Sequence, residues 1–225
     1  MKYIVLDLEM NPIINKFKAE RCICKNEIVE IGAILVDENY EKKSQYRQYV
    51  KPQYNEIGRR YEELTGVTNE LVKDAPHFKH AMDNFCQWQK DCCSADEEVA
   101  VYAWSENDRR QMEQEFMLKQ MKLGDYSVLR CSWYDLQKEY CTMLGLQRMI
   151  TLQAAVGAMG EAFVGRMHDA LWDAENTARI FILSRDKTNF KKVMKPVLEV
   201  LQPRRPMTYS LGDLFGDKLK DLKIE

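Results

Sequence analysis

The chain has 225 residues and a formal net charge of −2, with 45% hydrophobic and 30% charged residues. These values indicate one globular domain with a substantial core, and they exclude an intrinsically disordered chain. The sequence shows no signal-peptide pattern, no apolar run of membrane-spanning length, and no C-x-x-C pair among its seven cysteines. We therefore expect a cytoplasmic protein with reduced thiols that does not enter a membrane.

The first segment, Tyr3 to Leu6, is an uninterrupted run of aromatic and aliphatic residues. It predicts a strand that is buried on both faces. Asp7 and Glu9 follow at the end of this strand, and the strand period of two places both on one face. Two carboxylates there repel each other and need a cation, for which oxygen ligands favour magnesium or manganese. The Asp-x-Glu pattern alone also fits a strand that ends in a solvated acidic turn.

The next segments predict a hairpin and then a helix. Residues 27–36 and 44–50 have strand character, and we expect this antiparallel hairpin to pair with the first strand. Within residues 62–76, the segment 64–68 predicts a short connector, and Asp74 with Pro76 predicts the start of a helix over residues 77–92. This helix has a core-facing stripe at helical spacing, made of Phe78, Met82, Phe85 and Trp88.

A further buried strand is predicted for residues 99–104, followed by a helix that reaches Lys122. Asp108 lies where this strand gives way to the helix, a place where aspartate is commonly a helix cap. Residues 127–131 predict a short strand, and residues 133–144 predict a helix.

The last part of the chain predicts two helices and a tail. Residues 152–159 form the shorter helix, and residues 168–183 predict one that packs through small residues, with His168 ahead of Asp173. We expect a domain over residues 1–200, then a linker and an amphipathic tail over 201–225. An exposed apolar stripe on that tail would be a liability, so it is predicted to dock on the domain or to form a homodimer.

The acidic candidates and the histidine form an ordered set: Asp7-x-Glu9, then Asp108, then His168-x-x-x-x-Asp173. This set resembles the DEDDh class of 3′–5′ exonucleases, and the resemblance covers Met1 to about Leu183. It is closest to the branch of enhanced-RNA-interference and histone-mRNA exonucleases. The segments that carry this branch resemblance are Leu64-Thr65-Gly66-Val67-Thr68, Trp104 before Asp108, residues 135–140 and residues 165–174.

The resemblance implies a ribonuclease H-like α/β fold, a mixed sheet flanked by helices in which the first three strands are antiparallel and the later ones parallel. It implies two Mg²⁺ or Mn²⁺ ions held by the four acidic residues, with Asp7 bridging both. His168 would act as the general base, since histidine is the side chain best suited to proton transfer near neutral pH. The implied substrate contacts are Leu8, Met10 and Trp104. Two residues depart from the family pattern: Met10, where many relatives have a small or hydroxyl residue, and Trp172, where many have an acidic one.

The implied function is a metal-dependent exonuclease that hydrolyses single-stranded nucleic acid from its 3′ end to nucleoside 5′-monophosphates. RNA is favoured by the branch resemblance, and a DNA-directed exonuclease is the alternative. A non-catalytic nucleic-acid-binding module is disfavoured because all five positions of the set are occupied. Lys51, Arg59, Arg60 and the lysines of residues 191–195 could follow a phosphate backbone, but they equally fit an ordinary solvated surface.

Overall fold

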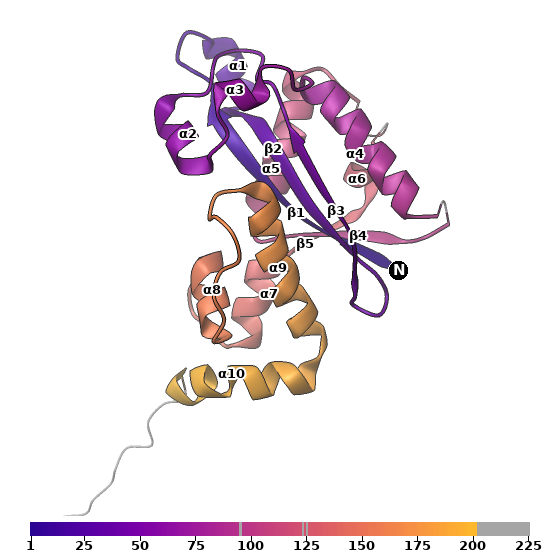
Figure 1. The fold of residues 1–225 in the computed structure, drawn as a ribbon, viewed down its shortest axis with the longest axis vertical. Helices are drawn as coiled ribbons and strands as arrows, with labels where there is room; N and C mark the ends of the chain where they lie inside the picture. The colour runs from indigo at the N-terminus through magenta and orange to yellow at the C-terminus, as the bar shows by residue number, and fades with distance from the viewer. Residues whose placement is uncertain (95, 123, 125, 202–225) are drawn as a thin grey trace, which may run out of the picture.

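The computed structural model describes residues 1–94, 96–122, 124 and 126–201. Its five strands form one sheet in the order β3-β2-β1-β4-β5 (Figure 1). The strands β1, β2 and β3 pair antiparallel, whereas β4 pairs parallel with β1, and β5 parallel with β4. The predicted mixed sheet is therefore confirmed. The strands are β1 (Lys2–Pro12), β2 (Asn26–Val36), β3 (Lys42–Tyr49), β4 (Val99–Ala103) and β5 (Ser132–Asp135).

Strand β1 is longer than predicted, and this changes the surroundings of its carboxylates. It runs to Pro12 because β2 pairs with it over its full length, with a register shift between Glu9 and Met10. The pairing with β4 covers only Lys2 to Val5. Asp7 and Glu9 thus lie inside β1 rather than at its end, in the part where β4 no longer covers one edge of the strand.

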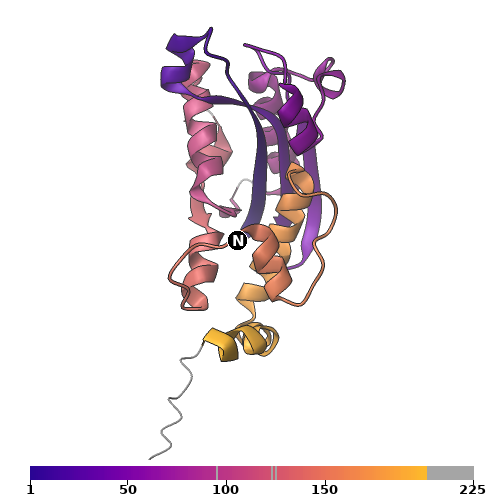
Figure 2. The same cartoon turned by 90° about the vertical axis from the view of Figure 1, so that its left-hand side faces the viewer.

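Ten helices surround the sheet in the described part of the chain, and Figure 2 shows α5 and α9 on opposite sides of β1. On one face, Val5 packs with residues of α7, α8, α9 and α10. On the other face, Leu6 packs with residues of α4 and α5. The helices are α1 (Lys18–Ile23), α2 (Arg59–Thr65), α3 (Asn69–Val72), α4 (Phe78–Cys92), α5 (Glu106–Leu118), α6 (Ser127–Arg130), α7 (Leu136–Met143), α8 (Leu152–Ala158), α9 (Ala170–Arg185) and α10 (Lys187–Leu201).

Three predicted segments differ from the structure. The connector predicted for residues 64–68 includes the last two residues of α2, and the short helix α3 that follows it was not predicted. Residues 127–131, predicted as a strand, contain helix α6, and strand β5 follows it. Residues 133–135 belong to β5 because they pair with β4, so the helix predicted from Trp133 begins only at α7. Asp135 ends the strand and caps α7, since its carboxylate accepts a hydrogen bond from the Lys138 amide at 2.8 Å.

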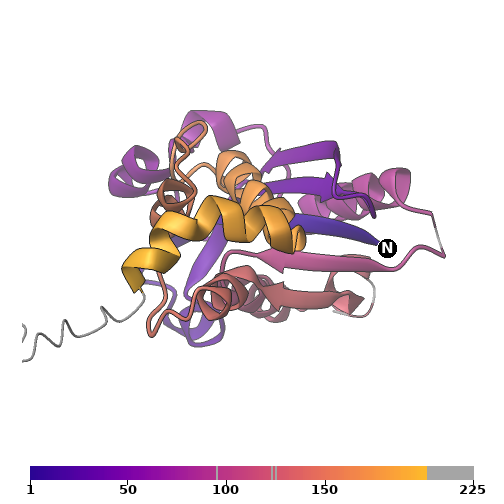
Figure 3. The ribbon, with the colours of Figure 1, turned by 90° about the horizontal axis from the view of Figure 1, so that it is seen from below.

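The chain closes with α9 and α10, and α10 lies across the end of α9 (Figure 3). Helix α10 reaches Leu201 although Pro196 lies inside it. The predicted linker and amphipathic tail from residue 202 onward lie outside the described residues. Within the described ranges, no helix combines the length and the apolar character needed to cross a membrane.

Candidate active site

Strand β1 directs Asp7 and Glu9 toward the face of the sheet that α9 covers. Its residues alternate, so that Val5 packs against α9 whereas Leu6 and Leu8 point into the opposite core. The partner of Asp7 on β2 is Gly32, and the partner of Glu9 is Glu30. Glu9 is buried and Asp7 is partly buried. The same-face placement predicted from the sequence is thus present, under the first turns of α9.

Asp108 reaches β1 from the other side of the sheet. It is not the cap of α5, because the Ser105 hydroxyl fills that role by accepting a hydrogen bond from the Asn107 amide at 3.2 Å. The Asp108 Oδ1 atom instead accepts a hydrogen bond from the Leu8 amide at 3.2 Å. Strand β4 does not pair with β1 beyond Val5, so the Leu8 amide has no partner on β4. The Asp108 carboxylate accepts its hydrogen bond instead.

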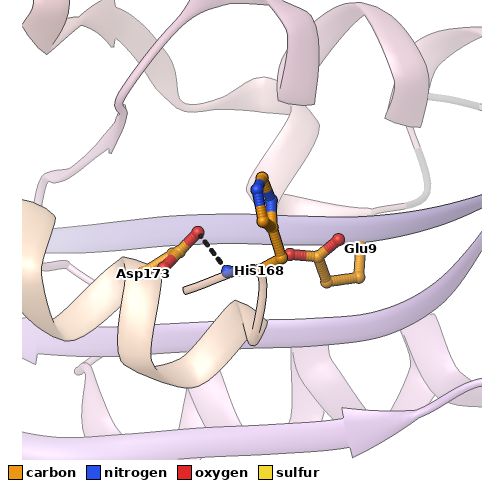
Figure 4. Close-up of side chains that lie close together, drawn as sticks. All are labelled: Glu9, His168 and Asp173. Atoms are coloured by element: carbon orange, nitrogen blue, oxygen red, sulfur yellow. Dashed lines mark hydrogen bonds between the residues drawn. The ribbon is translucent and has the colours of Figure 1, made fainter. Parts of the chain in front are cut away.

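The start of α9 brings Asp173 and His168 to the same place. Asp169 caps the helix by accepting from the Trp172 amide at 3.1 Å, and Asp173 follows one turn later. The Asp173 Oδ2 atom accepts from the His168 amide at 3.3 Å, which holds His168 in the left-handed region with φ at 59° (Figure 4). Glu9, His168 and Asp173 offer ligand atoms that all lie within 4.8 Å of one another.

A buried ion-pair network fixes α9 to the sheet, and the sequence reasoning missed it. The Glu30 Oε2 atom accepts a hydrogen bond from the Ala170 amide at 3.1 Å. The Arg47 Nε atom lies 3.1 Å from Glu30 Oε1, and Arg47 also pairs with Asp169. The available signal was Glu30 itself, a charged residue in an apolar strand, because a buried carboxylate requires partners.

The loop that carries His168 has two further supports. Arg166 donates hydrogen bonds to the carbonyls of Glu63 and Leu64, which ties this loop to the end of α2. On its other side, the Trp172 ring lies against Gly165, where an added Cβ would come within 2.3 Å of the ring. The Trp172 ring therefore supports the loop that carries His168.

Burial and repulsion by nearby carboxylates raise the pKa values of the four acidic residues of the site. Burial raises the pKa of Asp7 well above its usual value, and the charges of Asp108 and Asp173 raise it further. Burial, followed by the charge of Asp173, raises the pKa of Glu9 to about 8. Burial also raises the pKa values of Asp108 and Asp173 to about 7, although backbone amides donating to their carboxylates oppose the shift. Four carboxyl groups in this state must hold protons or a cation.

The donor set fits divalent cations. The ligand atoms that lie within 4.8 Å of one another come from two carboxylates and an imidazole, those of Glu9, Asp173 and His168. Asp7 and Asp108 are not part of that group, but Asp7 is close enough for its pKa to be raised by the charges of Asp108, Asp173 and Glu9. Sites rich in carboxylate oxygens select hard cations such as Mg²⁺ and Mn²⁺. The Asp173 Oδ1 atom is buried and has no hydrogen-bond partner among the described residues. Burying an oxygen atom without a partner costs folding free energy unless a bound ligand interacts with that atom.

The three predicted substrate contacts differ in their accessibility. Met10 is partly exposed and lines a hollow of about 470 Å³. The Leu8 side chain is instead buried in the core, and its contribution to the site is the backbone amide bound by Asp108. Trp104 is also buried, and its ring packs against Tyr140 at a centroid distance of 5.9 Å. The structure therefore places only the Met10 side chain where a substrate could touch it.

Comparisons with known proteins agree with this geometry. The model of the exonuclease family RNase_T matches residues 4–181. The chain is 31% identical over 173 residues to ERI1 exoribonuclease 2 of Xenopus laevis, a match that covers 68% of this chain and 25% of that relative. The chain thus spans about a quarter of the length of the curated relatives it matches.

Solved structures share the fold. The nuclease domain of 3′hExo, a DEDDh family member bound to rAMP, superposes with a TM-score of 0.71 at 21% identity. That match covers 84% of this chain and 94% of the other. A 3′-exonuclease solved for its 3′-end-specific recognition of the histone mRNA stem-loop gives a TM-score of 0.71 at 20% identity, with 83% of this chain and 82% of the other covered.

Proposed function

Because the chain belongs to the RNase_T exonuclease family, in its DEDDh class, we propose that it removes nucleotides one by one from the 3′ end of single-stranded RNA. The observation that carries the proposal is the convergence of Asp7, Glu9, Asp108 and Asp173 beside His168 at the open edge of β1. RNA is preferred over DNA in this proposal because the curated relatives are exoribonucleases.

Divalent metal ions serve the chemistry of this family, and the four carboxylates fit them. Two Mg²⁺ or Mn²⁺ ions held there would stabilise the attacking and the leaving oxygen of the phosphodiester. Asp7, Glu9, Asp108 and Asp173 are the proposed ligands. Burial of these groups and their mutual repulsion favour cation binding over four free charges.

His168 is the proposed base. Its ring lies beside Glu9 and Asp173, and its backbone is fixed by the hydrogen bond to Asp173. An imidazole nitrogen takes a proton from the attacking water, the new bond forms between the water oxygen and the phosphorus, and the bond to the 3′ oxygen of the preceding nucleotide breaks. That oxygen takes a proton from solvent, so each cycle releases a nucleoside 5′-monophosphate and a new 3′-hydroxyl end.

The remaining expectations extend this proposal. Met10 is the proposed contact to the terminal nucleotide, and residues 1–200 are the proposed catalytic domain. The tail beyond it is proposed to dock on the domain or on a second copy as a homodimer. A cytoplasmic location is proposed from the cysteine pattern, and all seven thiols are free.

The test uses 5′-labelled single-stranded RNA and DNA of the same sequence with the purified protein. The RNA should shorten stepwise in the presence of Mg²⁺ or Mn²⁺, and a blocked 3′ end should stop the reaction. Faster shortening of the DNA would support the DNA-directed alternative. Equal cleavage of circular RNA, or full activity after exhaustive chelation, would exclude the proposed reaction.

A further inference from the structure

A polar hollow lies beside the acidic site, between α1 and the first half of α5. Its volume is about 470 Å³, and it opens at Met10, the neighbour of Glu9. Arg21, Lys25 and Arg110 line it, and no carboxylate does. A cationic hollow next to a cluster of acids is unexpected in a chain whose formal net charge is −2.

The cations of the hollow are largely uncommitted. Arg21 and Lys25 form no ion pair with any described residue, and the Arg21 guanidinium donates to the Ile13 carbonyl. Arg110 lies 3.9 Å from Glu106, and both side chains are about two-thirds exposed, so this pair is weak. Residues 15–25 contain four cations and one carboxylate, which concentrates positive charge at this edge.

The hollow also offers hydrogen-bonding groups and apolar surface. The side chains of Asn107 and Gln114 line it and form no hydrogen bond within the described ranges. Ile23 is 45% exposed there, and Met10 adds a second apolar side chain. Cations, amides and apolar surface together suit phosphates, sugars and bases of a single strand.

The position of the hollow links it to the reaction. Two residues that line it are chain neighbours of proposed ligands. Met10 follows Glu9 and packs on the α5 side of the sheet, and Asn107 precedes Asp108, which reaches β1 from that same side. A neighbouring hollow at the start of α5 is lined by Arg109 and Arg110 as well as by Glu106, Glu113 and Asp135. Its three carboxylates outnumber its two arginines, and Arg109 pairs with Glu113, so this hollow is less favourable for phosphate. Of these two hollows, only the one between α1 and α5 is lined by cations without carboxylates.

We propose that this hollow, here called the α1–α5 groove, binds the sugar–phosphate backbone of the strand on the 5′ side of the bond that is cleaved. The inference rests on the proposed exonuclease function. It assigns the binding of longer substrates to α1, Lys25 and Arg110. It also predicts that affinity in the groove depends on the phosphates and not on the base sequence.

The experiment compares two double variants that each remove two positive charges. Lys25→Ala with Arg110→Ala alters the groove. Lys90→Ala with Lys187→Ala alters one exposed lysine of α4 and one of α10, and neither lysine lines the groove. For each protein, kcat/KM is measured on oligonucleotides of two and ten nucleotides, and salt-dependent binding of a 3′-blocked decamer is measured by fluorescence anisotropy.

In the wild-type protein, kcat/KM should be greater for the decamer than for the dinucleotide. The groove variant should lower this ratio by about 3- to 30-fold, the range expected when two exposed ion pairs are removed. Its salt slope for decamer binding should fall by about 0.7 for each phosphate that the variant no longer neutralises. The variant with Lys90→Ala and Lys187→Ala should retain the wild-type ratio and slope, and all three proteins should unfold at similar temperatures.

The outcomes separate the two proposals. If the wild-type protein hydrolyses neither oligonucleotide, the proposed function itself is wrong. If the wild-type protein is active but the groove variant keeps the wild-type length ratio and salt slope, the groove assignment is overturned. An equal decrease in both double variants would also overturn it, because the effect would then come from net charge.

Discussion

Gly32 of β2 lies directly against the backbone of Ala170, the first residue of α9. A Cβ atom on Gly32 would lie 2.1 Å from the Ala170 carbonyl carbon, so no side chain fits between the strand and the helix. Gly32 is also the partner of Asp7 in the sheet, and Asp173 lies one turn into α9. The close approach therefore sets the distance between two of the proposed metal ligands.

The Gly32→Ala variant tests this relationship. The added methyl group should push α9 away from β2, which lowers the free energy of unfolding by about 1–3 kcal/mol, the usual cost of overpacking. Hydrolysis should fall in the same protein because Asp173 and His168 move with α9. Thermal unfolding and the nuclease assay measure the two effects.

Gly157→Ala is the matched control, because a Cβ there meets nothing within 4 Å inside α8. It should leave hydrolysis intact and stabilise the protein by about 0.5–1 kcal/mol. A Gly32→Ala protein with normal stability and turnover would show that the close approach is not a constraint.

Replacing Asp7 with Asn separates metal binding from the fold. Asn keeps the size of the side chain but removes one charge from an acid whose pKa is raised by burial and by neighbouring carboxylates. We expect Mg²⁺ or Mn²⁺ binding and hydrolysis to be lost together, while the metal-free protein becomes as stable as wild type or more so. Isothermal titration calorimetry and thermal unfolding check both halves. Undiminished metal binding would remove Asp7 from the ligand set.

His168 variants test proton transfer apart from metal binding. His168→Asn is the better replacement, because Asn tolerates the left-handed backbone at φ 59° and His168→Ala adds strain there. Turnover should fall by roughly 10²–10⁴-fold, the range for a missing general base, while metal binding persists. The exposed His80 of α4 provides the control, and His80→Ala should retain turnover. Near-normal turnover of His168→Asn between pH 6 and 8 would falsify the base assignment.

The pH dependence of stability should have an unusual sign in the metal-free protein. Burial and mutual repulsion raise the pKa of Glu9 to about 8, and burial raises the pKa of Asp108 and Asp173 to about 7. The folded state thus binds these protons more tightly than the unfolded state, whose carboxyl pKa values are about 4. Their contribution is fully present below about pH 4 and is lost as the pH rises through 7 and 8.

Chelated protein should therefore unfold at a lower temperature at pH 8 than at pH 6. Added Mn²⁺ should raise the unfolding temperature more at pH 8 than at pH 6, since the cation replaces protons that are already leaving. In the Asp7→Asn protein, both the unfolding temperature after chelation and its increase on adding Mn²⁺ should depend less on pH. An unfolding temperature of the chelated wild-type protein that is independent of pH would show that these acids do not repel one another as described.

The sequence sufficed for features that local patterns encode. The apolar runs of β1, β2 and β4 marked the central strands, and the order of the acidic motifs identified the exonuclease class, which the family match confirms. The end of β1 was misplaced because two carboxylates resemble a turn, whereas β2 continues the pairing past them. Helix α6 was missed because four residues carry too little periodicity to distinguish a helix from a strand.

The supports of the site could not be predicted from local patterns. Glu30, Arg47 and Asp169 come from three separate elements, and their contacts exist only once α9 lies on the sheet. Trp172 departs from the family pattern in the sequence, but only the fold shows that its ring packs against Gly165. Leu8 and Trp104 were expected at the substrate, but their side chains are buried.

The docking of α9 on β2 also sets when, during synthesis of the chain, the proposed site is complete. Glu30 and Ala170 are 140 residues apart, and Asp173 and His168 leave the ribosome long after the strand that carries Asp7 and Glu9. Until α9 docks, the nascent chain holds Asp7, Glu9 and Asp108 without the histidine or the last carboxylate. The nascent chain therefore cannot assemble the proposed site until most of the domain has been made.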